Sequence, residues 1–406
     1  MLTSLAFIFL IGLSMATICQ KLRLPRIVGM LLTGIILGPY VLNLLDESIL
    51  NISSELRQIA LIIILLKAGL SLNLNDLKRV GRPAILMAFL PATFEIIAFA
   101  IFAPLLLDVN LVEALVMGAV LGAVSPAVVV PRMVSLMDNQ YGTKKSIPQL
   151  IMAGASCDDI YVIVLFSTFL GMAQGESANL VSLINIPISI ILGILLGIIA
   201  GYLLALFFET SYAHKHYVRN SLKVIIVLGV SFLLMSIETW LEPYVALSGL
   251  LAVVSMACVL KMKSNQFVSK RLSEKFGKLW LAAEVLLFVL VGAAVDIRYT
   301  MKAGLVAILM IFIALIIRSI GVTICLLKTK LTFKERLFTI FAYLPKATVQ
   351  AAIGSIPLSL GLPCGQIVLS VAVLAILITA PLGAILMDYT YKKLLTYDGE
   401  EKASSN

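Results

Sequence analysis

Two adjacent aspartates stand in the middle of a long apolar segment. Asp158 and Asp159 lie near the midpoint of an apolar run at about 148–172. An ionised carboxylate at the centre of a bilayer costs about 2.5–3.5 kcal/mol on insertion scales, and such residues commonly mark ion or proton pathways. Because neighbouring residues on a helix point about 100° apart, the two carboxylates cannot share one satisfied pocket. We therefore expect at least one to face a hydrated cavity, where a proton and a cation compete for it. The structural alternative is a pair of packing acids neutralised by basic neighbours.

Two prolines interrupt other apolar segments. Pro126 lies within the run at about 112–131, and Pro345 lies within the run at about 337–359. A proline removes a backbone hydrogen bond in mid-helix, and non-helical backbone at membrane depth is tolerated only beside protein or water. We expect the two broken helices to cross, antiparallel, near the aspartates.

Polar residues flank both prolines. Lys346 follows one of them, and Ser125 and Thr348 lie close to the breaks in the sequence. Half-helix ends carry partial charges of both signs, so a lysine can compensate the negative ends. We expect Lys346 to do this, and the hydroxyl oxygens of Ser125 and Thr348 to be available to an ion.

The composition places these residues in a membrane protein. Of the 406 residues, 61% are hydrophobic and 13% are charged, and the mean hydropathy is +1.06. Soluble domains are about half apolar and about a quarter charged, so a soluble enzyme is excluded. The alternating strands of an outer-membrane barrel are absent. We expect an all-α polytopic membrane protein. The sequence has no Walker-type nucleotide motif, so we expect no enzyme activity and no cofactor, and transport would run on an ion gradient.

Apolar runs of roughly membrane-spanning length occur thirteen times. They lie at about 2–19, 26–44, 57–74, 83–106, 112–131, 148–172, 181–208, 220–237, 244–260, 279–295, 304–327, 337–359 and 366–390. The first run lacks a basic leader and a small-residue cleavage site, so we expect no removable signal peptide.

The net charge of +9 follows the membrane topology. Of the 31 basic residues, 24 lie in alternate gaps between the apolar runs and in the C-terminal tail, whereas the other gaps hold Arg57, Arg298 and Lys302. By the positive-inside rule the N-terminus is outside and the C-terminus cytoplasmic. We therefore expect a multi-pass protein of the plasma membrane, as in the inner membrane of a bacterial cell, and no nucleic-acid partner.

A weak internal repeat relates the two halves. The sequence Ala-Ile-Leu-Met at 84–87 recurs at 307–310, an offset of 223 residues, and at the same offset Glu95 matches Arg318. The offset spans seven runs, and an odd number inverts the orientation, as in the inverted repeats of secondary transporters. Two opposite charges at related positions predict a buried salt bridge.

The repeat predicts four parts of the chain. The first inverted repeat covers 1–175 and contains the Asp158–Asp159 pair, and the second covers 218–391. Between them, 176–217 would form a connecting helix and a cytoplasmic loop. The last part, 392–406, would be a cytoplasmic tail.

The residues resemble the cation–proton antiporter superfamily, in its sodium/proton antiporter branch that includes the NHA-type exchangers and bacterial relatives. The stretch LPKATVQAAIGS at 344–355 is the most specific match. The other matching stretches are 29–39, AVSPAVVVP at 123–131, the aspartate pair, and 378–384.

This resemblance implies a thirteen-helix inverted-repeat fold with crossed broken helices, a mobile core domain, a dimerisation domain and elevator-like alternating access. Asp159 corresponds to the ion-binding carboxylate of the family and Asp158 to its neighbour, while Glu95 and Arg318 match a core salt bridge. The implied partners are Na⁺ or Li⁺, H⁺, the bilayer and a second copy in a homodimer.

One departure from the family concerns charge movement. Electrogenic bacterial antiporters carry a lysine where this chain has Arg318. An arginine cannot give up its proton in a protein, so we expect electroneutral exchange.

The sequence leaves three alternative functions open. A K⁺/H⁺ antiporter would use the same residues with a different cavity geometry. A cation channel would build its pore from several subunits. A sodium-coupled organic-anion symporter of related fold would have a site richer in Asn, Gln and Thr.

Overall fold

The computed structural model describes residues 1–71, 81–174, 180–213, 219–241, 245 and 247–398. In these residues the secondary structure is helical, apart from an isolated bridge between Tyr141 and Tyr397. The predicted all-α class is therefore confirmed. Parts of the predicted domain boundaries at 175–176 and 217–218, and of the tail at 399–406, lie outside the described residues.

The helices follow the apolar runs closely. They are α1 (Leu2–Lys21), α2 (Arg26–Leu37), α3 (Glu47–Asn51), α4 (Ser53–Ser71), α6 (Arg82–Met87), α7 (Leu90–Leu107), α8 (Leu111–Leu121), α9 (Pro126–Asp138), α10 (Ile147–Ala173), α11 (Leu180–Ala213), α12 (Asn220–Leu241), α13 (Gly249–Lys263), α14 (Gln266–Ala293), α15 (Ile297–Cys325), α16 (Phe333–Ala342), α17 (Thr348–Gly354), α18 (Ile356–Ser359) and α19 (Gly365–Leu394).

Each of the thirteen apolar runs overlaps a helix or a broken pair of helices in the described part of the chain. Nine helical segments there are long and apolar enough to cross a membrane without counting shorter helices such as α2. The exact number of spans stays a prediction. One interruption was not predicted, because the run at 83–106 is divided into α6 and α7 at Ala88–Phe89. Pro91, in the first turn of α7, has no N–H to continue a helix across this point.

Two of the spans are broken in the middle, where the prolines predicted it. The first is α8 and α9, separated by 122–125, and Pro126 begins α9. The second is α16 and α17, separated by 343–347. The breaks contact each other directly, because the Ser125 N–H donates to the Pro345 carbonyl at 2.8 Å.

The two broken spans also begin alike. Asn110 and Glu113 form a capping box at the start of α8, and Thr332 and Glu335 form one at the start of α16. A capping box satisfies two amides that a helix N-terminus leaves unpaired. Both pairs are separated by 222 residues, close to the offset of the sequence repeat. The related starts and breaks agree with an internal repeat.

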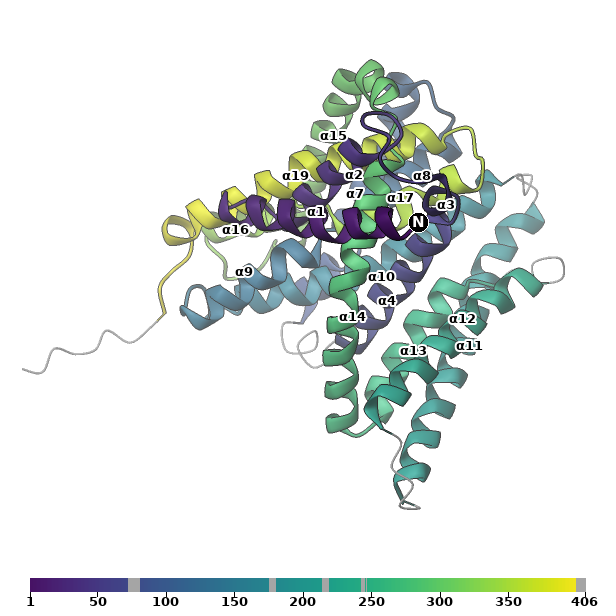
Figure 1. The fold of residues 1–406 in the computed structure, drawn as a ribbon. Coiled ribbons are helices and arrows are strands. Elements are labelled where there is room, and N and C mark those ends of the chain that lie inside the picture. Colours follow the sequence, from purple (N-terminus) through teal and green to yellow (C-terminus); the bar gives the residue numbers. More distant parts are fainter. Residues whose placement is uncertain (72–80, 175–179, 214–218, 242–244, 246, 399–406) are drawn as a thin grey trace, which may run out of the picture.

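The helices pack in two groups. The first group contains α1, α2, α4 and α11 to α14, with α14 packed against α2 and α4, and α13 against α11 and α4. The second contains α6 to α10 and α15 to α19, with α15 packed against α7 and α19, and α8 against α7 and α10. Figure 1 shows α11, α12 and α13 side by side, at the edge of the molecule away from α16. Both broken spans lie within the second group.

Small residues let α2 and α14 approach closely. A Cβ at Gly34 would overlap the backbone oxygen of Val289, and a Cβ at Gly292 would overlap the backbone oxygen of Leu31. Close backbone approach through small residues is a common way for helices to associate in membranes. This contact fixes α14 against the N-terminal helices.

We expect Gly34→Ala to destabilise the fold by about 1–3 kcal/mol, because the added methyl forces the two backbones apart. Gly277→Ala is the matched control, since a Cβ at Gly277 has no atom within 4 Å in the described structure. The control should be neutral or slightly stabilising, by up to about 1 kcal/mol, through helix propensity. Thermal unfolding in detergent measures both, and equal midpoints would contradict this packing.

Candidate ion-binding site

The aspartate pair lies near the middle of α10, which packs against α8, α9 and α6. Asp158 is 0% exposed and Asp159 is 7% exposed. Asp158 faces the break between α8 and α9, because its Oδ2 accepts a hydrogen bond of 2.8 Å from the Val124 N–H. The break frees this amide from the helical hydrogen-bond pattern, and the carboxylate satisfies it.

Arg318, on α15, connects the aspartate to the rest of the second group. Its Nη2 donates to Asp158 Oδ2 at 3.1 Å, and its Nη1 donates to Glu95 Oε2 at 2.7 Å. The guanidinium also donates to the Tyr343 carbonyl at 2.9 Å and to the Gly122 carbonyl. These two carbonyls lie at the ends of the helical segments α16 and α8, where intrahelical donors are missing. One buried side chain therefore joins two acids and both broken spans.

Glu95, on α7, accepts a hydrogen bond from a second basic side chain, Lys346. The Lys346 Nζ lies 2.5 Å from Glu95 Oε2 and both side chains are buried. Glu95 and Arg318 thus meet as the repeat predicted. That Lys346 compensates the half-helix ends stays a prediction. Its ammonium pairs with a carboxylate because an unpaired charge at this depth would be far more costly.

Charge is balanced within this cluster. Glu95, Asp158, Arg318 and Lys346 form a continuous set of buried contacts that contains two acids and two bases. A full set of partners offsets much of the cost of desolvating each ion. The cluster therefore carries no net charge when all four groups are ionised.

Asp159 stands outside this balance. Within the described part of the chain no basic nitrogen lies within 4.0 Å of its carboxylate, and its Oδ1 has no hydrogen-bond partner. A buried carboxylate of this kind stays ionised only when a cation joins it, and otherwise it takes up a proton. Asp159 is therefore suited to hold either one.

Other unpartnered oxygens occur at the two breaks. Ser125 Oγ, Thr348 Oγ1 and Asp158 Oδ1 are buried and make no hydrogen bond with the described residues. Buried polar atoms are normally paired, so an unpaired group calls for an explanation. Ser125 precedes α9 and Thr348 begins α17, so oxygens from both broken spans and from α10 are available to a hard cation, which prefers oxygen ligands.

Three residues that the sequence did not single out hold the second break. The Gln350 side chain accepts from the Ala347 N–H at 2.7 Å and donates to the Ala123 carbonyl at 2.8 Å. Thr379, on α19, accepts from the Lys346 N–H at 2.9 Å. Tyr343 stacks its ring 5.6 Å from the Arg318 guanidinium carbon. Gln350 and Thr379 lie within the stretches 344–355 and 378–384 that match the family, and this position could have indicated them from the sequence.

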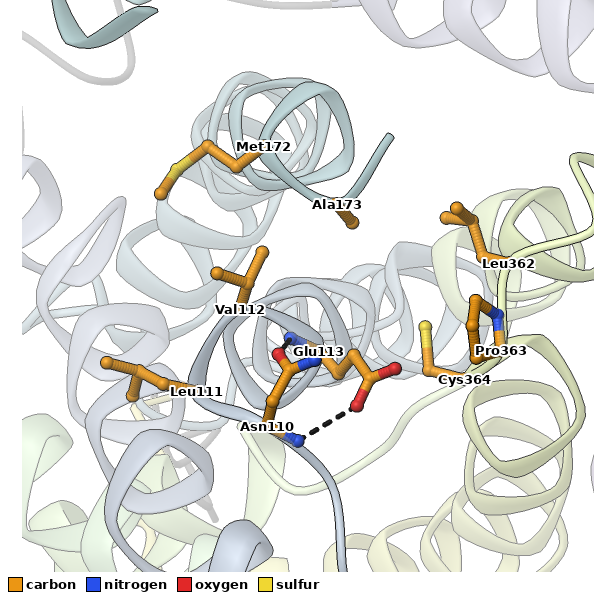
Figure 2. A pocket seen from close by; sticks show the side chains of 9 residues that line it. All are labelled: Asn110, Leu111, Val112, Glu113, Met172, Ala173, Leu362, Pro363 and Cys364. Carbon is orange, nitrogen blue, oxygen red and sulfur yellow. Dashed lines mark hydrogen bonds between the residues drawn. The ribbon is translucent and has the colours of Figure 1, made fainter. Parts of the chain in front are cut away.

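A separate cavity does not belong to this site. Figure 2 shows its lining, at the start of α8, the end of α10 and the segment before α19. The volume of this cavity is about 420 Å³. Glu113 supplies a carboxylate there, but that group accepts from the Asn110 N–H at 2.8 Å in the capping box. None of the candidate ion-binding residues lines this cavity.

Comparison with known proteins agrees with this geometry. Residues 5–388 match the family described as sodium/hydrogen exchanger, transmembrane. The chain belongs to this family. It is 33% identical over 377 residues to sodium/hydrogen exchanger 9B2 of Mus musculus, covering 90% of this chain and 67% of that protein. It is 34% identical to sodium/hydrogen exchanger 9B1 of Homo sapiens, covering 92% of this chain and 73% of that protein.

A solved structure shares the fold. The sodium proton antiporter MjNhaP1 of Methanocaldococcus jannaschii superposes with a TM-score of 0.81 at 23% identity, over 96% of this chain and 97% of that one. This match confirms the predicted antiporter fold, and the family match over residues 5–388 confirms the predicted superfamily. Family membership also supports cation/proton antiport by a multi-pass membrane transporter, rather than an enzyme.

The contacts of Glu95 predict strong energetic coupling. Glu95→Gln leaves Lys346 without a carboxylate partner, and breaking a buried pair typically costs about 3–5 kcal/mol. We expect Glu95→Gln combined with Lys346→Met, or with Arg318→Met, to cost less than the sum of the single changes, with coupling of about 0.5–3 kcal/mol. Thermal or denaturant unfolding of each double-mutant cycle measures this.

The control cycle uses Arg132 and Asp388, whose side chains are paired at 2.9 Å but are 23% and 42% exposed. Arg132→Met with Asp388→Asn should couple by no more than about 1 kcal/mol, because exposed pairs are screened. Coupling at Glu95 no larger than in this control would contradict the buried network.

Tyr343 gives a second prediction. A Cβ at Gly154, one turn before Asp158, would overlap the Tyr343 hydroxyl. We expect Gly154→Ala to displace the ring from Arg318 and to lower stability by about 1–3 kcal/mol. Gly154→Ala combined with Tyr343→Phe, which removes the overlapping oxygen, should recover much of the loss, and no recovery would show that another contact is responsible.

Proposed function

We propose that this chain exchanges Na⁺ or Li⁺ for H⁺ across the membrane, with the proton and the cation competing for Asp159. The observation that carries the proposal is the charge balance. Glu95 and Asp158 each contact a buried base, whereas Asp159 has none among the described residues. A buried carboxylate without a basic partner is neutralised either by a proton or by a cation, so the two ligands exclude each other.

The surrounding oxygens complete the proposed site. Ser125, Thr348 and the free oxygen of Asp158 would coordinate the cation together with Asp159, in the site opened by the two breaks. Asp158 would act mainly by position, because its other oxygen is held by Val124 and Arg318. Pro126 and Pro345 would keep the two breaks open.

Alternating access would move the second group of helices against the first in an elevator-like manner. Both broken spans and all four charges of the balanced cluster belong to the second group, so the site would move as one unit. The bound proton or cation makes Asp159 neutral, and only a neutral site crosses the low-dielectric region readily.

We propose that exchange is electroneutral. A second proton per cycle would need another group that changes its protonation with ion binding. Arg318 cannot lose a proton, and the Lys346 ammonium donates to Glu95. One proton therefore replaces one monovalent cation on Asp159.

The proposed setting is the plasma membrane, as in a bacterial inner membrane, with the N-terminus outside, the C-terminus cytoplasmic and the chain in a homodimer. The distribution of basic residues supports the orientation. Family membership favours antiport over an organic-anion symporter or a channel. Potassium is the competing cation, and the experiment below includes it.

Asp159→Asn should abolish cation-dependent proton flux, because an amide can neither titrate nor neutralise a cation. The assay uses vesicles with a preset pH gradient, to which Na⁺, Li⁺ or K⁺ is added. Na⁺ and Li⁺ should dissipate the gradient in the unmodified protein. Asp158→Asn should lower the flux less than Asp159→Asn does.

Asp138→Asn is the matched control, because Asp138 ends α9 and its side chain is exposed. It should leave flux unchanged. Substantial Na⁺-dependent flux in folded Asp159→Asn would remove Asp159 from the site, and flux with K⁺ alone would reassign the cation.

Electroneutrality has a separate test. An electrogenic cycle that moved one net charge would be biased by about 2.3 kcal/mol per 100 mV, roughly fiftyfold in equilibrium. With the potential set by K⁺ and valinomycin, we expect the Na⁺ gradient at which proton flux reverses to be independent of voltage. A reversal point that moves with voltage would point to Asp158 or Lys346 as a second proton carrier.

A further inference from the structure

A large cavity lies between the two groups of helices. Its volume is about 720 Å³, and its walls come from α4, α11, α12 and α13 on one side and from α10, α17 and α18 on the other. On α10 it is lined by 166–168, 170–171 and 174, which places it toward the end of that helix. Neither Asp158 nor Asp159 lines it.

Arg57 is the basic residue of this cavity wall. It lies in the second turn of α4 and is 7% exposed, yet its Nε and Nη1 have no hydrogen-bond partner in the described structure. A guanidinium carries five N–H donors, and leaving them unpaired away from water is costly. Among the described contacts no acid lies within 4.0 Å of the Arg57 guanidinium, although the charge of Glu55 acts on it from a greater distance.

The rest of the lining suits an amphipathic ligand. Hydroxyl and amide groups are supplied beside Arg57 by Ser54 and Gln58, and across the cavity by Ser355. Apolar surface is supplied by Ile188 and Leu360, which are 38% and 46% exposed. The cavity is of the size that holds small organic ligands or cofactors.

We propose that this cavity binds a phosphate group on Arg57, carried either by free phosphate or by the headgroup of a phospholipid. The two unpaired nitrogens are enclosed in the cavity wall, so Arg57 would turn its planar guanidinium toward the cavity to hold phosphate oxygens in a bidentate manner. The Ser355 hydroxyl would supply a further donor. The apolar wall accommodates an acyl chain in the lipid case. The evidence for this site does not rest on the exchange proposed at Asp159.

Thermal unfolding of the purified full chain in detergent tests the proposal. The probes are Tris phosphate against Tris chloride at equal ionic strength, and dioleoyl phosphatidylglycerol against dioleoyl glycerol, which lacks the phosphate. We expect at least one phosphate-bearing probe to raise the unfolding midpoint in a saturable way. Arg57→Met should weaken its apparent affinity about tenfold or more, since hydrogen bonds to charged groups are worth about 1.5–3 kcal/mol.

Arg271→Met is the matched control, because it removes the same charge from an exposed position on α14. It should keep the full effect of the probe. Without ligand, Arg57→Met should be at least as stable as the unmodified protein, since it removes an unpartnered buried charge, and Arg57→Gln provides a second variant if the first fails to fold.

Each outcome decides the proposal. Stabilisation by both phosphate-bearing probes that depends on Arg57 supports a general phosphate site, and stabilisation by the phospholipid alone supports a headgroup site. No stabilisation of the unmodified protein by either probe overturns the proposal. Equal stabilisation of Arg57→Met and the unmodified protein overturns it too.

Discussion

The structure depends on neutralising charge in a place that water does not reach. Arg318 lies at the centre of this constraint, because one guanidinium contacts Glu95, Asp158 and the carbonyl groups at two helix breaks. With Lys346 on Glu95, the four charges sum to zero. Of the two adjacent aspartates, Asp159 is left without a basic partner among the described residues, and the proposed function follows from this.

The same constraint explains the form of the broken spans. A break in mid-membrane exposes amides and carbonyls that cannot be left unpaired. Four amides of the breaks have partners. The Val124 N–H donates to Asp158 and the Lys346 N–H to Thr379. The Ser125 N–H donates to the Pro345 carbonyl, and the Ala347 N–H to the Gln350 side chain. The backbone is thereby held open while the hydroxyl oxygens of Ser125 and Thr348 stay unpaired. Rigid breaks with spare oxygens are what a site for a small hard cation requires.

Much of this could be predicted from the sequence, because charges and prolines are rare and costly inside a membrane. Asp158, Asp159, Pro126 and Pro345 stood out for that reason, and the offset of 223 residues paired Glu95 with Arg318. The contact between the Lys346 side chain and Glu95 was not predicted, because the two residues lie 251 positions apart and nothing in the local sequence specifies that approach.

Other contacts could not be predicted, because they also join residues far apart in the sequence. The Arg318–Asp158 pair joins residues 160 positions apart, and Gln350 is one of many polar residues until its carbonyl partners across the crossing are known. The interruption between α6 and α7 was missed because the apolar run continues through it. Composition predicts the spans and prolines mark the two central breaks, whereas the apolar pattern alone does not show the interruption before Pro91.

Proton release on cation binding tests the central claim most directly. Na⁺ is added to weakly buffered, purified protein at a pH where the empty site is protonated, and a pH indicator counts the protons that leave. If one carboxylate holds either ligand, about one proton should leave for each Na⁺ bound, and Asp159→Asn should release none. Na⁺ binding without proton release, or release that persists in Asp159→Asn, would contradict the claim that Asp159 is the group for which the two ions compete.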